Sequence, residues 1–252
     1  MSETLQIRIH GDEAAPTLIY LPGLHGDWTL VGNFRRAVAG RVRFVEMIYP
    51  RTLTWSLEEY AVAIETALLE RGIARGWLLG ESFGSQIAWP LSARKQFLTD
   101  GIILAGGFGR HPLQGAVLLA ERIAGRIPLS LLTQILFGYA RLARGRFRRS
   151  PEAQAEIQEF IARRTELDRR AAVHRLHLVA RSDFRPILCA FPVPVFALTG
   201  AFDPIVPWML VRRSLRRGCP ALREFKIFWR ADHTVLGSAP KPSADLVIKW
   251  MR

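Results

Sequence analysis

Gly80-Glu81-Ser82-Phe83-Gly84 is the stretch of this chain that decides its fold. It follows the short apolar run 77–79 and precedes residues 85–96, which are compatible with a helix. A turn this tight holds its central residue at strained backbone angles, and glycines two positions away on either side keep the strand and the helix from colliding. The order of strand, Gly-x-Ser-x-Gly motif and helix makes Ser82 a candidate nucleophile. The alternative is an ordinary glycine-flanked turn after a buried strand.

The rest of the chain alternates between strand-like and helix-like segments. Apolar or alternating runs, which predict strands, lie at residues 5–9, 17–21, 42–48, 77–79, 101–105, 193–198 and 223–229. Helical periodicity lies at residues 30–39, 56–71, 85–97, 206–217 and 243–251. This alternation predicts the α/β class, with a mostly parallel central sheet flanked by helices on both faces.

Residues 110–185 interrupt this alternation. They contain no strand candidate, but they carry helix-like runs at residues 115–124, 130–142, 151–164 and 167–180. We therefore expect a single-domain core, residues 1–109 and 186–252, with a helical lid inserted at 110–185. An apolar stripe in the insertion either packs on the core or faces substrate, and its members are Leu131, Leu132, Ile135, Leu136 and Tyr139.

Length and composition fit one large core. The chain has 252 residues, of which 49% are hydrophobic. The first residues show no apolar leader, and no uncharged run approaches the length of a membrane span, so we expect a cytoplasmic protein. Cys189 and Cys219 lack the spacing of a metal site and are expected to be free, buried thiols.

The formal net charge of +13 comes mainly from arginine. Residues 141–185 hold 12 arginines against 6 acidic residues, so the excess is local. The densest cluster, with Phe147 as its only aromatic neighbour, consists of Arg141, Arg144, Arg146, Arg148 and Arg149. Because aromatic platforms for stacking bases are missing, we expect a solvated helix end and no specific binding of nucleic acid.

Two later loops supply partners for Ser82. Asp203 follows a predicted strand and precedes a predicted helix, where its carboxylate can orient an imidazole, although an aspartate before a proline is also a common turn residue. His233 follows the last predicted strand and is placed to act as the base. The other histidines are placed less well. His174 and His177 share a helix face, but no third ligand has fitting spacing, so we expect no metal site.

The order Ser82, Asp203, His233, with each residue in a strand-to-helix loop, resembles the α/β-hydrolase superfamily of serine esterases and thioesterases. The resemblance runs from the first strand to the last helix and implies an α/β-hydrolase fold with a catalytic triad. It also implies an oxyanion hole formed by the backbone N–H groups of Leu24 and Phe83. Pro22 departs from the commoner His-Gly pattern of that loop, but Gly23 is kept.

Three further residues are candidates for lining the substrate pocket. His25 and Trp28 flank the expected oxyanion loop, and Trp208 follows the loop of Asp203. For both tryptophans a purely structural position is the alternative.

The resemblance implies a carboxylic ester hydrolase that forms an acyl-enzyme on Ser82 and needs no metal or organic cofactor. The apolar stripe favours a small-molecule ester with an apolar, short to medium acyl or alcohol group. A thioesterase or an acyltransferase would share the same acyl-enzyme, and the basic insertion favours substrates with a phosphate. A ligand receptor that retains a slow hydrolase site is a further alternative. The sequence leaves the oligomeric state open.

Overall fold

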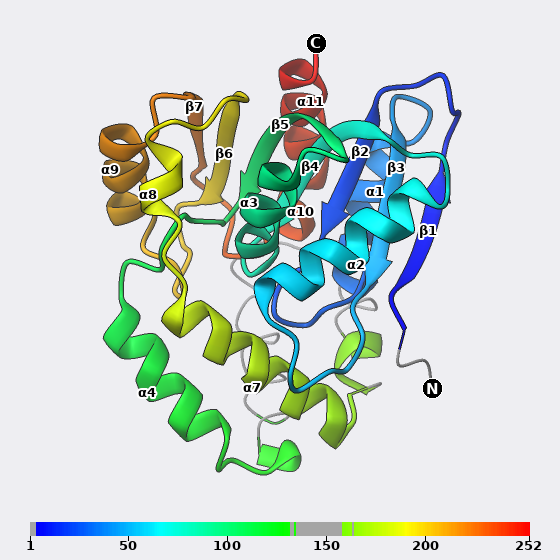
Figure 1. Ribbon diagram of the computed structural model, residues 1–252. Helices are drawn as coiled ribbons and strands as arrows, with labels where there is room; N and C mark the ends of the chain where they lie inside the picture. The colour runs from blue at the N-terminus through cyan, green and yellow to red at the C-terminus, as the bar shows by residue number, and fades with distance from the viewer. Residues whose placement is uncertain (1–3, 132–133, 135–157, 163) are drawn as a thin grey trace.

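A computed structural model describes residues 4–131, 134, 158–162 and 164–252. In this part of the chain seven strands form one sheet in the order β1-β3-β2-β4-β5-β6-β7 (Figure 1). Only β1 runs antiparallel to its neighbour. The strands are β1 (Gln6–His10), β2 (Thr17–Leu21), β3 (Arg43–Ile48), β4 (Arg75–Glu81), β5 (Leu98–Ala105), β6 (Val195–Gly200) and β7 (Leu222–Phe228). The predicted mostly parallel sheet is therefore confirmed.

Helices cover both faces of the sheet (Figure 1). The core helices are α1 (Gly32–Val38), α2 (Leu57–Leu69), α3 (Gly84–Arg94), α8 (Arg185–Leu188), α9 (Trp208–Gly218), α10 (Val235–Ser238) and α11 (Pro240–Trp250), with a short 3₁₀ turn, η1, at Thr29–Val31. Residues of α2, α3 and α9 share one apolar cluster, and residues of α1, α10 and α11 share the other. Within β2, Ile19 and Leu21 belong to the first cluster, whereas Leu18 and Tyr20 belong to the second. This alternation follows from the two-residue period of a strand, and it places one core on each face.

Local chemistry sets the ends of several helices. Ser56 and Glu59 form a reciprocal capping box at the start of α2, which satisfies two backbone N–H groups that the helix leaves free. Helix α3 ends at Arg94, three residues before the predicted end, because Lys95 adopts the left-handed conformation with φ +67°.

The inserted segment 110–185 contains two described helices of at least ten residues, α4 (Gln114–Ala124) and α7 (Glu166–Arg181). They pack against each other and lie beyond the carboxyl ends of β2 and β3 (Figure 1). The predicted runs 130–142 and 151–164 lie mostly outside the described residues, as do the five-arginine cluster, Phe147 and all of the apolar stripe except Leu131. The assignment of 110–185 as a lid stays a prediction.

Both cysteines are free thiols, as expected. Cys219 is buried, but Cys189 is exposed, because it lies at the surface end of α8. Among the described helices, none is both long and apolar enough to span a bilayer.

Candidate active site

Ser82 occupies the turn between β4 and α3 at φ +49°, a backbone conformation that is costly for a residue with a Cβ atom. The glycines around it have no room for a side chain. A Cβ atom on Gly84 would lie 2.0 Å from the carbonyl oxygen of Leu21, and one on Gly80 would lie 2.8 Å from the backbone of Ser85. The strand and the helix can thus approach each other only because both positions are glycine.

Hydrogen bonds to neighbouring backbone groups hold this turn in place. The Ser82 N–H group donates to the carbonyl of Ala105 at 3.0 Å, and the Ser85 hydroxyl donates to the carbonyl of Ser82 at 2.6 Å. The carbonyl of Phe108 accepts from Gln86 at 2.7 Å and from Trp89 at 3.0 Å. The strained turn is therefore held by the ends of β4 and β5 and by α3, so Ser82 does not have to be stable in this conformation on its own.

The structure brings Ser82, Asp203 and His233 together. His233 Nε2 lies 3.0 Å from Ser82 Oγ, and His233 Nδ1 lies 2.7 Å from Asp203 Oδ2. An ionised carboxylate can only accept a hydrogen bond, so Nδ1 carries the proton of the neutral ring. Nε2 is then left to accept a proton from the serine hydroxyl, which is the arrangement a general base needs.

The loop after β6 holds Asp203 in place. Its second oxygen, Oδ1, accepts backbone N–H groups from Ile205 at 2.9 Å and from Val206 at 2.8 Å. The side chain is completely buried. These contacts leave Oδ2 directed at the imidazole, so the carboxylate reaches His233 without rearrangement.

The pKa of His233 reflects two opposing effects. Burial alone would lower it, but the hydrogen bond and the charge of Asp203, together with the charges of Glu81 and Asp232, outweigh burial and raise the pKa above its ordinary value of 6.5. The protonated imidazole is thus stabilised, as a base that must accept a proton requires.

Tyr20 and Glu81 form a buried pair beside Ser82 that we did not expect from the sequence. The hydroxyl of Tyr20 donates to Glu81 Oε2, and both side chains are almost completely buried. Burial and the neighbouring carboxylate raise the pKa of Tyr20 well above 10, so its hydroxyl stays protonated. The two residues lie 61 positions apart, and no short pattern in the sequence links them.

The N–H groups of Leu24 and Phe83 are free to bind a ligand. Within the described part of the chain, neither group donates to a carbonyl or a side chain. The loop of Leu24 is shaped by a turn in which the N–H group of Gly26 donates to the carbonyl of Gly23 at 2.9 Å. Such N–H groups could donate to a substrate oxygen that carries negative charge, and this role of Leu24 and Phe83 stays a prediction.

His25 and Trp28 line a cavity of about 500 Å³ next to this loop. Burial, together with the charges of Arg164 and Arg175, lowers the pKa of His25, and this outweighs the opposing effect of nearby carboxylates. The guanidinium of Arg8 stacks over the ring of Trp28, 3.9 Å from its centre. The cavity is strongly basic. Its charged lining residues are Arg8, Asp27, Arg35, Arg36, Arg51, Glu159, Arg164, Asp168 and Arg175.

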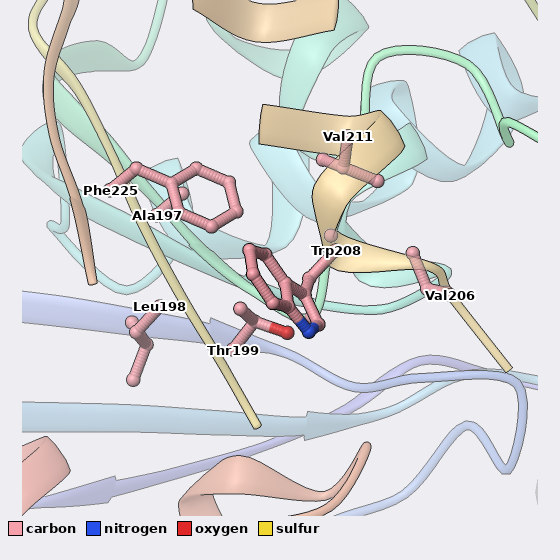
Figure 2. A pocket seen from close by; sticks show the side chains of 9 residues that line it. Ala197, Leu198, Thr199, Val206, Trp208, Val211 and Phe225 are labelled. Atoms are coloured by element: carbon pink, nitrogen blue, oxygen red, sulfur yellow. The ribbon is translucent and has the colours of Figure 1, made fainter. Parts of the chain in front are cut away.

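Trp208 lies elsewhere. Figure 2 shows its indole surrounded by Thr199, Val211 and Phe225, where these residues border a cavity of only about 10 Å³. Its Nε1–H group donates to the carbonyl of Ala201 at 3.3 Å. A space of this size holds about one water molecule. The indole therefore supports the loop that carries Asp203, and contact between Trp208 and substrate stays a prediction.

The other histidines have local partners. His10 contacts Glu46, His174 contacts the carbonyl of Trp55, and His177 contacts Glu121. His111 is buried near the loop of Asp203, and burial lowers its pKa. In the described residues, no group of three or more His, Cys, Asp or Glu side chains is arranged to hold a metal ion.

No protein-family model matches the chain, and no curated protein sequence matches it. Many solved structures resemble it in fold. An esterase from Thermogutta terrifontis is 18% identical, with a TM-score of 0.76, 98% of this chain covered and 93% of that chain. An enol-lactonase from Burkholderia xenovorans LB400 is 17% identical, with a TM-score of 0.79, 98% of this chain covered and 96% of that chain.

An esterase from Exiguobacterium antarcticum is 14% identical, with a TM-score of 0.79, 98% of this chain covered and 95% of that chain. Similarity at this level of identity concerns the fold. The resemblance inferred from the turn at Ser82 is thus confirmed at the level of fold: this chain has the α/β-hydrolase fold.

Proposed function

We propose that this protein is a serine hydrolase that cleaves carboxylic esters through an acyl-enzyme on Ser82. One observation carries the proposal. The side chains of Asp203, His233 and Ser82 form an unbroken chain of hydrogen bonds of 2.7 and 3.0 Å, although they come from three separate loops. Two esterases and an enol-lactonase share the fold, which supports an acyl-transfer reaction.

In the first half of the reaction, Ser82 Oγ attacks the acyl carbon while His233 Nε2 takes the hydroxyl proton. The negative charge that develops on the carbonyl oxygen is stabilised by the N–H groups of Leu24 and Phe83. Removing one such donor typically costs ~3 to 4 kcal/mol of transition-state stabilisation. His233 then gives its proton to the leaving alcohol, and the acyl-enzyme remains.

In the second half, water attacks the acyl-enzyme. His233 takes a proton from the water and returns a proton to Ser82 Oγ, and the carboxylic acid leaves. Asp203 stays ionised throughout, because its role is to hold the Nδ1–H tautomer and to stabilise the imidazolium. The proposed chemistry requires no metal and no organic cofactor.

We propose small-molecule esters with an apolar, short to medium acyl or alcohol group as substrates. The basic cavity beside His25 favours a second candidate, because its lining carries six arginines against three acidic residues. Such a lining attracts a substrate with a phosphate or carboxylate group. Cleavage or transfer of a phosphate-bearing thioester is therefore the alternative reaction.

The proposal is tested by measuring turnover of a panel of p-nitrophenyl esters by the wild-type protein and by Ser82→Ala. We expect rapid turnover by the wild type and none above background by the variant, with an unchanged circular dichroism spectrum. Slow, single-turnover acylation with a ligand-dependent rise in melting temperature would support the receptor alternative instead. Turnover that survives in Ser82→Ala would refute the proposal.

A further inference from the structure

Arg175 is the most deeply buried arginine of the described residues, and the proposed mechanism does not use it. It lies on α7 of the inserted segment, and only 2% of its surface is exposed. Its Nη1 atom donates to the carbonyl of Leu24 at 2.9 Å, and its Nη2 atom donates to the carbonyl of Pro50 at 3.1 Å. Among the described residues no carboxylate pairs with it, and its Nε atom has no partner.

Burial of this cation has a physical cost, because a guanidinium loses its hydration and gains no opposite charge here. Two neutral carbonyls and the ring of Tyr49, whose centre lies 5.5 Å from the guanidinium carbon, recover only part of that loss. An apolar side chain of similar length would dock α7 at a lower cost. An apolar side chain, however, cannot donate hydrogen bonds, whereas Arg175 connects the loop after β2 to the loop after β3 with two of them.

The first of these loops is the one that carries Leu24. The guanidinium also packs directly on Gly26, where a Cβ atom would lie 2.4 Å from Nη1. Gly26 adopts φ +76° and closes the turn with the carbonyl of Gly23. Arg175 therefore contacts this turn at two points, its carbonyl at residue 24 and its backbone at residue 26.

Two ion pairs attach the neighbouring part of the insertion to the same region. Arg164 pairs with Asp27, and Arg51 pairs with Asp168 at 2.5 Å. Burial alone would raise the pKa of Asp27, but the charges of His25 and Arg164 and the hydrogen bond from Arg164 outweigh burial and lower the pKa, so Asp27 is ionised at neutral pH. The residue pair Arg164–Asp27 thus attaches the segment just before α7 to the loop that carries Leu24, and Asp168 attaches the start of α7 to the loop after β3.

We propose that Arg175 is a positioning residue for the oxyanion hole: its guanidinium holds the Leu24–Gly26 turn so that the N–H group of Leu24 faces the substrate oxygen. The proposal rests on the proposed function, and it gives α7 an indirect part in catalysis through the loop of Leu24. A side chain of the inserted segment then completes the fold of a core loop.

The test compares Arg175→Met with Arg175→Lys and with a matched control, Arg181→Met. Arg181 lies on the same helix, is exposed and pairs with Glu121. Arg175→Met removes both hydrogen bonds, and we expect kcat to fall about 100-fold with little change in KM, as for other small displacements of catalytic groups. Arg175→Lys keeps the charge but cannot reach both carbonyls at once, so its loss should be intermediate. Arg181→Met should keep wild-type values.

A trifluoromethyl ketone separates positioning from a merely structural role. Ser82 Oγ attacks its carbonyl carbon, the hydroxyl proton passes to His233, and the carbonyl oxygen becomes an oxyanion where the transition state has one. Its inhibition constant in Arg175→Met should therefore rise by the same factor as kcat/KM falls. The pH dependence of kcat/KM should keep its wild-type midpoint, because Arg175 contacts neither Asp203 nor His233.

Three results would overturn the proposal. The first is a kcat of Arg175→Met within about twofold of wild type, and the second is a fall in kcat that the fraction of unfolded protein, measured by circular dichroism, fully explains. The third is an unchanged affinity of Arg175→Met for the ketone. If Arg175→Met does not fold, Arg175→Lys decides by the same measurements. A wild-type protein that neither cleaves esters nor binds the ketone would refute the proposed function itself, and this proposal with it.

Discussion

At the scale of single residues, the candidate site depends on the basicity of His233. Its imidazole must be neutral at the pH of the reaction and basic enough to take the proton of Ser82. Its pKa is raised above 6.5, and the hydrogen bond to Asp203 is the largest effect in that direction. Neutral imidazole is the active form, so kcat/KM should be low below this pKa and should rise to a plateau above it. The contribution of His233 to folding stability changes with pH in the opposite direction to kcat/KM. Because the folded pKa exceeds the unfolded one, His233 contributes stability that is fully present below the unfolded pKa and lost as pH rises through the folded pKa.

Asp203→Asn tests this account. The substitution removes the charge that raises the pKa, so the midpoint of the pH dependence of kcat/KM should move to lower pH. The plateau should fall by about four orders of magnitude, because an amide can hold the imidazole in the wrong tautomer. Measurement of kcat/KM from pH 5 to 9 checks both effects. A variant with the wild-type midpoint would contradict the assigned role of Asp203.

Ser82 offers a second prediction, this time about strain. At φ +49° a side chain costs energy that glycine does not pay. Ser82→Gly should therefore be more stable than Ser82→Ala by about 1 kcal/mol, while both variants are inactive. Urea denaturation of the two variants gives the difference, and an alanine variant at least as stable as the glycine variant would show that the turn is unstrained.

At the scale of elements, the closeness of α3 to the end of β2 decides whether the turn can form. Gly84→Ala would place a methyl group 2.0 Å from the backbone oxygen of Leu21, which cannot move without disturbing the sheet. We expect a loss of stability of about 3 kcal/mol or more.

Gly115→Ala is the matched control, because Gly115 lies in α4 with no atom near its Cβ position. It should be neutral or stabilising by up to ~1 kcal/mol. Denaturation midpoints measure both changes. Equal midpoints for Gly84→Ala and the wild type would show that α3 can shift away from β2.

The sequence was informative about elements because their patterns are local. Every strand of the sheet overlaps an apolar or alternating run, and Ser82, Asp203 and His233 could be proposed because each lies just after such a run. Helix α3 was predicted too long, because nothing in the composition shows that Lys95 takes a left-handed conformation. No local pattern in the sequence indicates that Glu81 pairs with Tyr20, 61 positions away.

What the sequence could not provide were contacts between distant segments. Arg175 contacts Leu24 across 151 positions, and it occurs among many other arginines of the insertion, so nothing distinguishes it before the fold is known. The surroundings of Trp208 also depend on distant segments. Its indole packs against β6 and β7 around a space that holds about one water molecule, and contact between Trp208 and substrate stays a prediction.

At the scale of the whole molecule, the chain carries a net charge of +13. Part of this positive charge lies in the cavity beside His25, which six arginines line. Its field should favour anionic substrates. We expect KM for p-nitrophenyl succinate, but not for p-nitrophenyl butyrate, to rise as salt is increased from 20 to 500 mM, since salt screens exposed charges over about a Debye length.

Arg8→Gln should raise KM for the succinate ester alone, because Arg8 is exposed and stacks on Trp28 in the wall of the cavity. The matched control is Arg71→Gln, an exposed residue outside this cavity whose guanidinium bonds to the carbonyl of Ala67. Equal salt dependence for the two esters would show that the cavity does not take part in substrate binding.

The central claim is that Ser82 is the nucleophile of a hydrogen-bonded triad. Its most direct test is reaction of the wild-type protein with a fluorophosphonate, followed by peptide mapping in a mass spectrometer. We predict a single adduct on Ser82 that is lost in His233→Ala, because without the base the hydroxyl is a weak nucleophile. An adduct on another residue, no adduct at all, or equally fast labelling of Ser82 in His233→Ala would contradict the claim.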